Sequence, residues 1–237
     1  MKKTAPAARS RKSGATSRKS ANLELRRTPL QARGQETFER ILNVTGELLD
    51  EVGTESVTTN LIAKAAGINV ATLYQYFPNK RSILVTLFQR QTAQRSAVAE
   101  KEFAARRQEG GPWRDALEAA IDATFALRRG VPGVLALRQA MRSDPELLEY
   151  DREDTRNISN WLATEIVGST SVSRDEAELV ARCCVEAMAA LLDMWLIESR
   201  GKDDRIIRQA KVLVESYLAP YIKGPKVPRT KRAARRR

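Results

Sequence analysis

The chain has 237 residues, of which 42% are hydrophobic, so it is long enough to bury a core and to divide into two domains. It contains no histidine, so any site that it forms lacks the usual general base and the commonest metal ligand. Its formal net charge of +12 is typical of proteins that bind nucleic acids or acidic membranes, so the position of the charge matters.

The positive charge lies at the two ends of the chain. Residues 1–33 contain ten Lys or Arg and one Glu, and residues 223–237 contain eight Lys or Arg and no acid. Together they carry +17, which leaves −5 for residues 34–222. Both ends are poor in large apolar residues, so we expect disordered basic arms that become ordered on a polyanion. The first can also be read as an organelle transit peptide, although residues 1–20 lack the necessary apolar face.

Neither a membrane span nor a cofactor site is indicated by the sequence. No apolar run approaches the roughly 18 residues of a membrane span, and no apolar signal segment follows the basic start. Cys183 and Cys184 are adjacent in a helical pattern and so face different sides, which favours core thiols over a disulfide or metal pair. We therefore expect a soluble, cytoplasmic protein without a cofactor, a metal or catalytic residues.

Apolar residues recur three and four positions apart and strand patterns are nearly missing, so the predicted fold class is all-α. The first helix is predicted at 35–51, with an apolar stripe on one side and Gly53 as its terminator. A second begins after Thr58, which can cap it, and ends at Gly67.

The third predicted helix begins at Asn69, whose side chain can cap it, and ends before Pro78. Leu73 and Phe77 stand four residues apart and therefore share a face that we expect to point inward. Asn79 can cap a fourth helix. The residues left on the outer face and flanks of the third helix are small or polar: Ala71, Thr72, Tyr74, Gln75 and Tyr76.

Two short helices joined by a tight turn around Gly67 form a helix-turn-helix, whose second helix can enter a DNA major groove. The charge pattern agrees with this interpretation. Residues 56–99 contain no Asp or Glu but five Lys or Arg, whereas residues 34–55 contain six acids and only Arg40 as a base. We expect the face formed by residues 56–99 to suit phosphate.

The segment "TTNLIAKAAGINVATLYQYFPNKRSIL" resembles the N-terminal domain of the TetR family of transcriptional repressors, and the layout of the chain from about Arg33 to Ile222 is similar to that of the family. The resemblance implies a helix-turn-helix DNA-binding domain at 34–80. It also implies a C-terminal helical domain at 81–222 that binds a ligand and dimerises.

By this resemblance, the positions that face bases and neighbouring phosphates are Val70, Ala71, Thr72, Tyr74, Gln75 and Tyr76. Gln75 can pair bidentately with adenine, and the tyrosine hydroxyls can reach phosphate oxygens. Lys80 at a helix start favours a phosphate, as do Thr58 and Asn60 at the preceding helix, while Asn69 is first of all a cap. The tyrosines can instead be ordinary half-buried aromatics, and Lys80 a solvated charge.

The remaining helices are predicted at 80–109, 113–129, 134–142, 145–167, 174–200 and 203–222. Each of the last two has two adjacent apolar stripes, which indicates two packing partners. One partner is the rest of the chain and the other a twofold mate, so we expect a homodimer through about 174–222, as the resemblance also implies. A monomer with a thick core is the alternative. A dimer would bind a pseudo-palindromic operator in double-stranded DNA.

The resemblance further implies an effector pocket between the domains, with candidate lining residues Phe103, Trp113, Phe125, Met141, Trp161 and Met188. Such a pattern at helical spacing is also typical of an ordinary core. Arg128, Arg129, Arg138 and Arg142 can pair an anionic ligand, or can neutralise the acidic segment 144–154.

The function expected from these features is a sequence-specific DNA-binding transcriptional regulator, associated with the nucleoid through its DNA. We expect a repressor that a small apolar effector releases from a palindromic operator. The alternative is a constitutive or architectural DNA-binding protein without an inducer, in which the basic arms dominate and sequence hardly matters.

Overall fold

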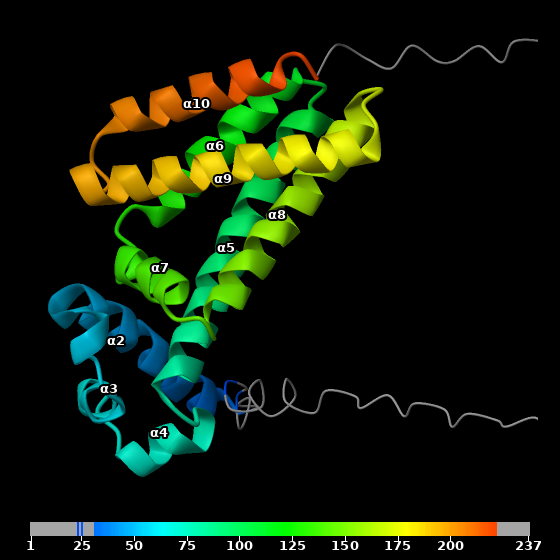
Figure 1. Cartoon of the computed structure of the whole chain (residues 1–237). Coiled ribbons are helices and arrows are strands. Elements are labelled where there is room, and N and C mark those ends of the chain that lie inside the picture. Colours follow the sequence, from blue (N-terminus) through cyan, green and yellow to red (C-terminus); the bar gives the residue numbers. More distant parts are fainter. Residues whose placement is uncertain (1–22, 24, 26–30, 222–237) are drawn as a thin grey trace, which may run out of the picture.

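A computed structural model of the protein describes residues 23, 25 and 31–221, and every regular element among them is a helix (Figure 1). The predicted all-α class is therefore confirmed. Most of the predicted arm at 1–33 and the whole of the predicted arm at 223–237 lie outside the described residues. Within the described part, no helix is both long enough and apolar enough to span a bilayer.

The helices are α2 Ala32–Ser56, α3 Thr59–Ala65, α4 Val70–Tyr76, α5 Lys80–Gln108, α6 Trp113–Arg128, α7 Val134–Ser143, α8 Leu148–Ser169, α9 Arg174–Ser199 and α10 Asp204–Leu218. Most boundaries agree with the sequence predictions within a few residues. Gly53 interrupts the first helix, as predicted, and a short helical stretch follows it to Ser56. Gly53 has φ +73° and ψ 163°, a conformation that glycine adopts without steric cost, and helical residues stand on both sides of it.

The predicted N-terminal caps are present. Thr58 Oγ1 accepts a hydrogen bond from the N–H of Leu61 at 3.2 Å, and Asn69 Oδ1 accepts one from the N–H of Ala71 at 2.8 Å. Asn79 forms a reciprocal capping box at the start of α5. These side chains satisfy backbone donors that the first helical turn leaves unpaired, so each short helix starts at a defined residue.

The buried residues form two cores. The first joins α2, α3, α4, the beginning of α5 and one face of α7. The second joins the later part of α5 with α6, α8, α9 and α10. Figure 1 shows α5 running from α4 toward the α9 and α10 layer, so this helix contributes to both cores. The predicted boundary at 80/81 therefore does not coincide with the packing, because α7 adds Leu137 and Met141 to the first core.

The start of α7 lies in backbone contact with α2. A Cβ added to Gly133 would stand 2.6 Å from the carbonyl oxygen of Gly46, and Gly133 also has φ +73°. The N–H of Gly133 donates to Asp50 Oδ2 at 2.8 Å, and Thr54 Oγ1 donates to the carbonyl of Ala136 at 3.3 Å. The contact requires glycine on both helices, and it makes α7 and α2 one packed unit.

Candidate nucleic-acid interface and ligand cavity

The turn between α3 and α4 is closed by backbone geometry. Gly67 has φ +63°, and the N–H of Ile68 donates to the carbonyl of Ala63 at 3.0 Å. Leu73 and Phe77 are both 0% exposed, so the inner face of α4 is anchored in the first core. The predicted inward orientation of this pair is confirmed, and it holds the opposite face of α4 outward.

The outer face of α4 is small and polar. Ala71, Tyr74 and Gln75 are exposed, while Val70, Thr72 and Tyr76 are half-buried. The Tyr74 hydroxyl lies 3.0 Å from Thr59 Oγ1, which ties α4 to α3. The Tyr76 ring packs edge-on against Phe38, with centroids 6.1 Å apart. Each tyrosine therefore also stabilises the helix-turn-helix through a contact with another helix.

The other predicted contact residues lie at helix starts. Thr58, Asn60 and Asn69 are exposed, and the first two stand together at the N-terminus of α3. Lys80 is half-buried, and its Nζ donates to the carbonyl of Thr54 at 3.0 Å, which fastens the start of α5 to the end of α2. Nine of the ten predicted residues therefore lie on α3, α4 and their N-caps, and Lys80 is the first residue of α5.

Most basic side chains of the segment 56–99 already have partners within the protein. The ion pairs are Arg81 with Asp144 at 2.7 Å, Arg90 with Glu39 at 2.6 Å and Arg95 with Asp154 at 2.7 Å. Lys80 donates to the carbonyl of Thr54 instead, so Lys64 is the one cation of the five with neither an ion pair nor a side-chain hydrogen bond in the described part of the chain. The expectation that this face suits phosphate through its charge therefore applies mainly to Lys64. Sequence reasoning missed these three ion pairs because the partners are 51 to 63 residues apart in the chain.

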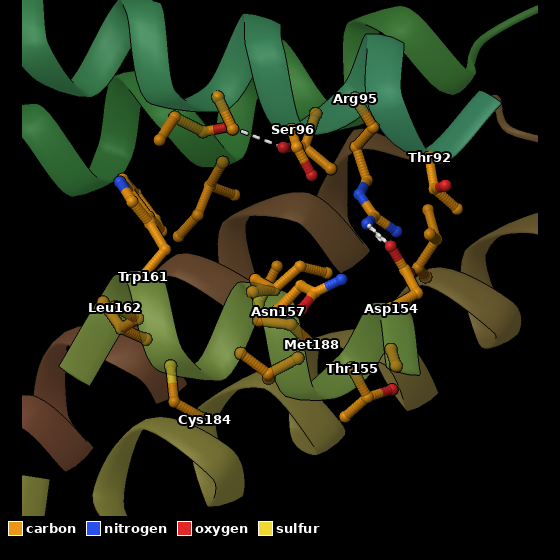
Figure 2. A pocket seen from close by; sticks show the side chains of 18 of the residues that line it. Thr92, Arg95, Ser96, Asp154, Thr155, Asn157, Trp161, Leu162, Cys184 and Met188 are labelled. Carbon is orange, nitrogen blue, oxygen red and sulfur yellow. Dashed lines mark hydrogen bonds and ion pairs between the residues drawn. The ribbon is translucent and has the colours of Figure 1, made fainter. Parts of the chain in front are cut away.

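A cavity of about 540 Å³ borders the second core and lies between α5, α6, α7, α8 and α9 (Figure 2). Some of its lining residues, such as Glu100 and Asn157, are exposed to solvent. Its apolar lining includes Leu117, Ile121, Phe125, Trp161, Leu162 and Met188. Its volume is in the range of pockets that bind small organic molecules. Trp161 and Leu162 lie at one end in Figure 2, and Thr92, Arg95 and Asp154 lie at the other.

Three of the six candidate pocket residues line this cavity, namely Phe125, Trp161 and Met188. The other three do not. Phe103 and Trp113 pack against each other edge-on, with centroids 5.7 Å apart, and are buried in the second core. Met141 is fully buried in the first core, because its face of α7 packs toward α2. The sequence correctly predicted that these three residues are buried. It did not predict whether each would lie in a core or line the cavity.

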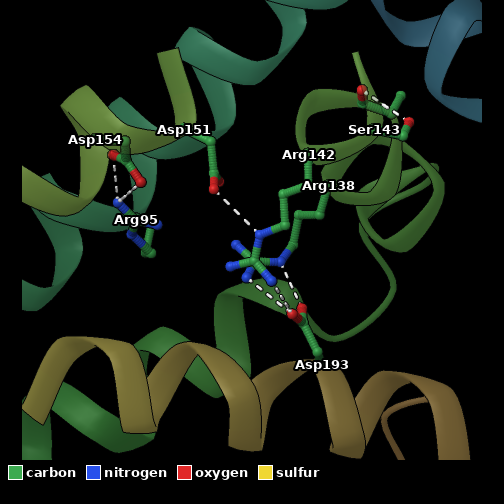
Figure 3. Close-up of polar contacts among 8 residues, drawn as sticks. Arg95, Arg138, Arg142, Ser143, Asp151, Asp154 and Asp193 are labelled. Atoms are coloured by element: carbon green, nitrogen blue, oxygen red, sulfur yellow. Dashed lines mark hydrogen bonds and ion pairs between the residues drawn. The ribbon is translucent and has the colours of Figure 1, made fainter. Parts of the chain in front are cut away.

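The polar end of the cavity holds a network of arginines and aspartates (Figure 3). Its ion pairs are Arg95 with Asp154 at 2.7 Å, Arg138 with Asp193 at 2.6 Å, and Arg142 with Asp193 at 2.7 Å and Asp151 at 3.1 Å. Arg138 and Arg142 stand one turn apart on α7, so both guanidinium groups reach Asp193 on α9. The sequence analysis counted Arg95 among the cations of 56–99 and Asp154 within the acidic segment 144–154, and it did not consider Asp193. It did not bring them together, because their proximity depends on helices that are distant in the chain.

Arg128, at the end of α6, differs from its neighbours. It is only 3% exposed, and its Nε and Nη2 have no hydrogen-bond partner in the part of the protein that the structure describes. Burial, reinforced by the positive charges of Arg95 and Arg138, lowers the pKa of Arg128 to about 9. Arg129, by contrast, pairs with Asp204 at 2.7 Å on the surface. Of the two readings for these arginines, neutralisation of the segment 144–154 accounts for Arg142 with Asp151, but not for Arg128.

Comparisons with known proteins give both parts of the chain a common family. Residues 41–87 match the family of bacterial regulatory proteins of the tetR type, and residues 112–218 match the tetracyclin repressor-like C-terminal domain. The protein belongs to the TetR family of transcriptional regulators. TetR-family regulators are generally non-enzymatic DNA-binding proteins.

Individual relatives agree with the TetR assignment. An HTH-type transcriptional regulator of Staphylococcus aureus (strain USA300) is 38% identical over 56 residues, which are 24% of this chain and 30% of that protein's length. A TetR-family regulator from Streptomyces coelicolor is 25% identical with a TM-score of 0.58, over 78% of this chain and 99% of that one. The fatty acid degradation regulator FadR from Bacillus halodurans shares the fold, at 18% identity and a TM-score of 0.61, over 79% and 95% of the two chains.

Proposed function

We propose that the protein is a sequence-specific DNA-binding transcriptional repressor that a small molecule releases from a palindromic operator. The observation that carries this proposal is the construction of α4, whose Leu73 and Phe77 are fully buried while Ala71 and Gln75 face solvent. A helix anchored in this way can lie in a major groove, because no acidic side chain projects from its outer face.

The sequence preference would come from a few side chains of α4. Gln75 can pair bidentately with adenine, Thr72 can donate or accept a hydrogen bond, and Ala71 can contact a thymine methyl group. Phosphate contacts would come from Lys64, from the tyrosine hydroxyls and from the exposed start of α3 at Asn60. Lys80 would contribute little, because its ammonium group is held by the carbonyl of Thr54.

A homodimer through α9 and α10 would present two copies of α4 to the DNA. One stripe of α10, which includes Val214 and Leu218, is buried in the second core. Large apolar residues of these two helices nevertheless remain exposed in the single chain, namely Leu179, Ile197, Val212 and Leu213. An exposed apolar surface of this kind supports a twofold interface, and a twofold dimer would require a pseudo-palindromic operator.

Helix α7 contacts both the cavity and the helices of the DNA-binding part. Arg138 and Arg142 of α7 line the cavity, while Met141 packs in the first core and Gly133 contacts the backbone of Gly46 in α2. A ligand that shifts α7 would therefore shift α2, and the spacing of the two α4 helices would change. A coupling free energy of about 1–3 kcal/mol would suffice for an observable release.

The constitutive or architectural alternative is favoured by the basic ends of the chain, which carry +17. In that case affinity would come from charge and would fall steeply with salt for every DNA sequence. Sequence-specific recognition, by contrast, predicts that substitution of a side chain of α4 lowers the affinity for the operator and not for other DNA.

The two functions can be separated by fluorescence anisotropy with the DNA upstream of the protein's own gene and with a scrambled duplex of equal length. Gln75→Ala should weaken binding to the upstream DNA by about 1–3 kcal/mol and leave the scrambled duplex unaffected. Gln94→Ala is the matched control, because Gln94 is exposed on α5. If the protein binds both duplexes with equal affinity, and Gln75→Ala does not change that affinity, the architectural function would be supported instead.

A further inference from the structure

The cavity has two chemically different ends. Trp161 and Leu162 form an apolar end, and Arg95, Arg138 and Arg142 stand with their aspartates at the other (Figures 2 and 3). A purely apolar ligand would use only the first end. The charged groups at the polar end therefore indicate which class of ligand the cavity can bind.

The aspartates at the polar end are already engaged. Asp154 accepts from Arg95, Asp193 from Arg138 and Arg142, and Asp151 from Arg142. The charged lining as a whole is balanced, because Glu100 joins Asp151 and Asp154 opposite the three lining arginines. A cationic ligand would have to displace an arginine to reach one of these aspartates.

Arg128 is a fourth arginine of this region, and unlike Arg95, Arg138 and Arg142 it has no ion pair within the described structure. It stands next to the cavity. It follows the lining residues Thr124 and Phe125 by one turn of α6. Arg95 and Arg138, the cations whose charge acts on it, both line the cavity. Two of its nitrogens are buried without a hydrogen-bond acceptor, and an unpaired buried guanidinium is unfavourable.

We propose that the cavity binds an amphipathic anion, with an apolar body against Trp161 and Leu162 and a single carboxylate among Arg95, Arg128 and Arg138. This inference rests on the proposed function, since it names the class of effector for the same cavity. A carboxylate supplies the acceptor and the negative charge that Arg128 lacks, and arginine binds carboxylate oxygens with favourable geometry. A neutral ligand of equal length would leave Arg128 unpaired.

The proposal is tested on the full-length protein with three probes that share a ten-carbon chain: decanoate, decan-1-ol and decylamine. Isothermal titration calorimetry at neutral pH should give a dissociation constant for decanoate about tenfold or more below that of decanol. Decylamine should bind most weakly. Equal affinity for decanoate and decanol, or tighter binding of decylamine, would overturn the proposal, and this comparison needs no variant.

Arg128→Met then tests the assignment of the head group, because methionine keeps much of the apolar stem and removes the charge. The variant should lose the preference for decanoate over decanol and should bind decanol as well as the wild type does. Arg129→Met is the matched control, since Arg129 carries the same charge on the surface next to Asp204. A preference that survives in Arg128→Met would refute the role of Arg128.

The same probes distinguish this inference from the proposed function. If decanoate binds with the expected preference but the complex with upstream DNA persists, the anion site stands and release by a ligand in this cavity fails. If the three probes bind equally while decanol releases the DNA, the effector function stands and the anion site fails.

Discussion

Arg128 shows how a single residue can be placed for a partner outside the protein. Its side chain is buried beside Arg95 and Arg138, and the aspartates nearby are engaged with other arginines. Even with its pKa lowered to about 9, the guanidinium stays protonated at neutral pH, so it is a buried charge without an ion pair. Such a group lowers the stability of the free protein and raises its affinity for an anion.

We therefore predict that Arg128→Met stabilises the protein in the absence of ligand. The free energy of unfolding in urea should rise by about 1–3 kcal/mol, because a buried unpaired charge is replaced by an apolar side chain of similar length. Arg129→Met should instead leave stability unchanged or lower it by up to about 1 kcal/mol, because it removes a surface ion pair with Asp204 and a contact with the Trp195 ring. Destabilisation by Arg128→Met would show that the guanidinium is satisfied in the free protein.

Among the helices, α7 joins the first core to the cavity. Its arginines line the cavity, its apolar residues complete the first core, and its first turn contacts α2 through Gly133 and Gly46. Because packed interfaces shift as units, a displacement of α7 would be transmitted to α2 instead of being absorbed between them. The tight glycine contact is therefore the part of the fold on which the proposed coupling depends.

Gly133→Ala should weaken this contact. The added Cβ would stand 2.6 Å from the carbonyl oxygen of Gly46 in a left-handed conformation, so the variant should lose about 1–3 kcal/mol of stability. Calorimetry should show that the cavity still binds its ligand, while anisotropy should show that the ligand no longer releases the DNA.

Gly168→Ala is the control for this prediction, since Gly168 lies within α8 and an added Cβ there meets nothing within 4 Å. Alanine favours the helix, so this variant should be as stable as the wild type or slightly more stable. Unchanged stability and unchanged ligand-dependent release in Gly133→Ala would show that the contact has no role in coupling.

At the scale of the whole molecule, α9 and α10 carry large apolar residues that are exposed in the single chain. Leu179 is 64% exposed and Ile197 is 58% exposed, although both are large and apolar. Figure 1 shows α9 and α10 at the end of the molecule opposite α3 and α4. A twofold pairing at that end would join two chains and leave both copies of α4 accessible to DNA.

Ile197→Asp should therefore separate the dimer without unfolding the chain. The dissociation constant of the dimer, measured by analytical ultracentrifugation, should rise by about 30-fold or more, and binding to the upstream DNA should fall with it. Circular dichroism should remain helical, because Ile197 packs against little of its own chain. Val52→Asp introduces the same charge at an exposed apolar position on α2 and should leave the dimer intact. A wild type that sediments as a monomer would contradict the proposed assembly.

The sequence by itself determined the helices, their caps and the outward face of α4. These features depend on neighbours three or four residues apart, as in the cap of Asn69 on Ala71 and the shared inner face of Leu73 and Phe77. The tertiary structure alone decided which charges are already paired and which surface a buried residue joins. Arg95 meets Asp154 across 59 residues, and Met141 belongs to the first core instead of the cavity, because such contacts depend on how distant helices pack.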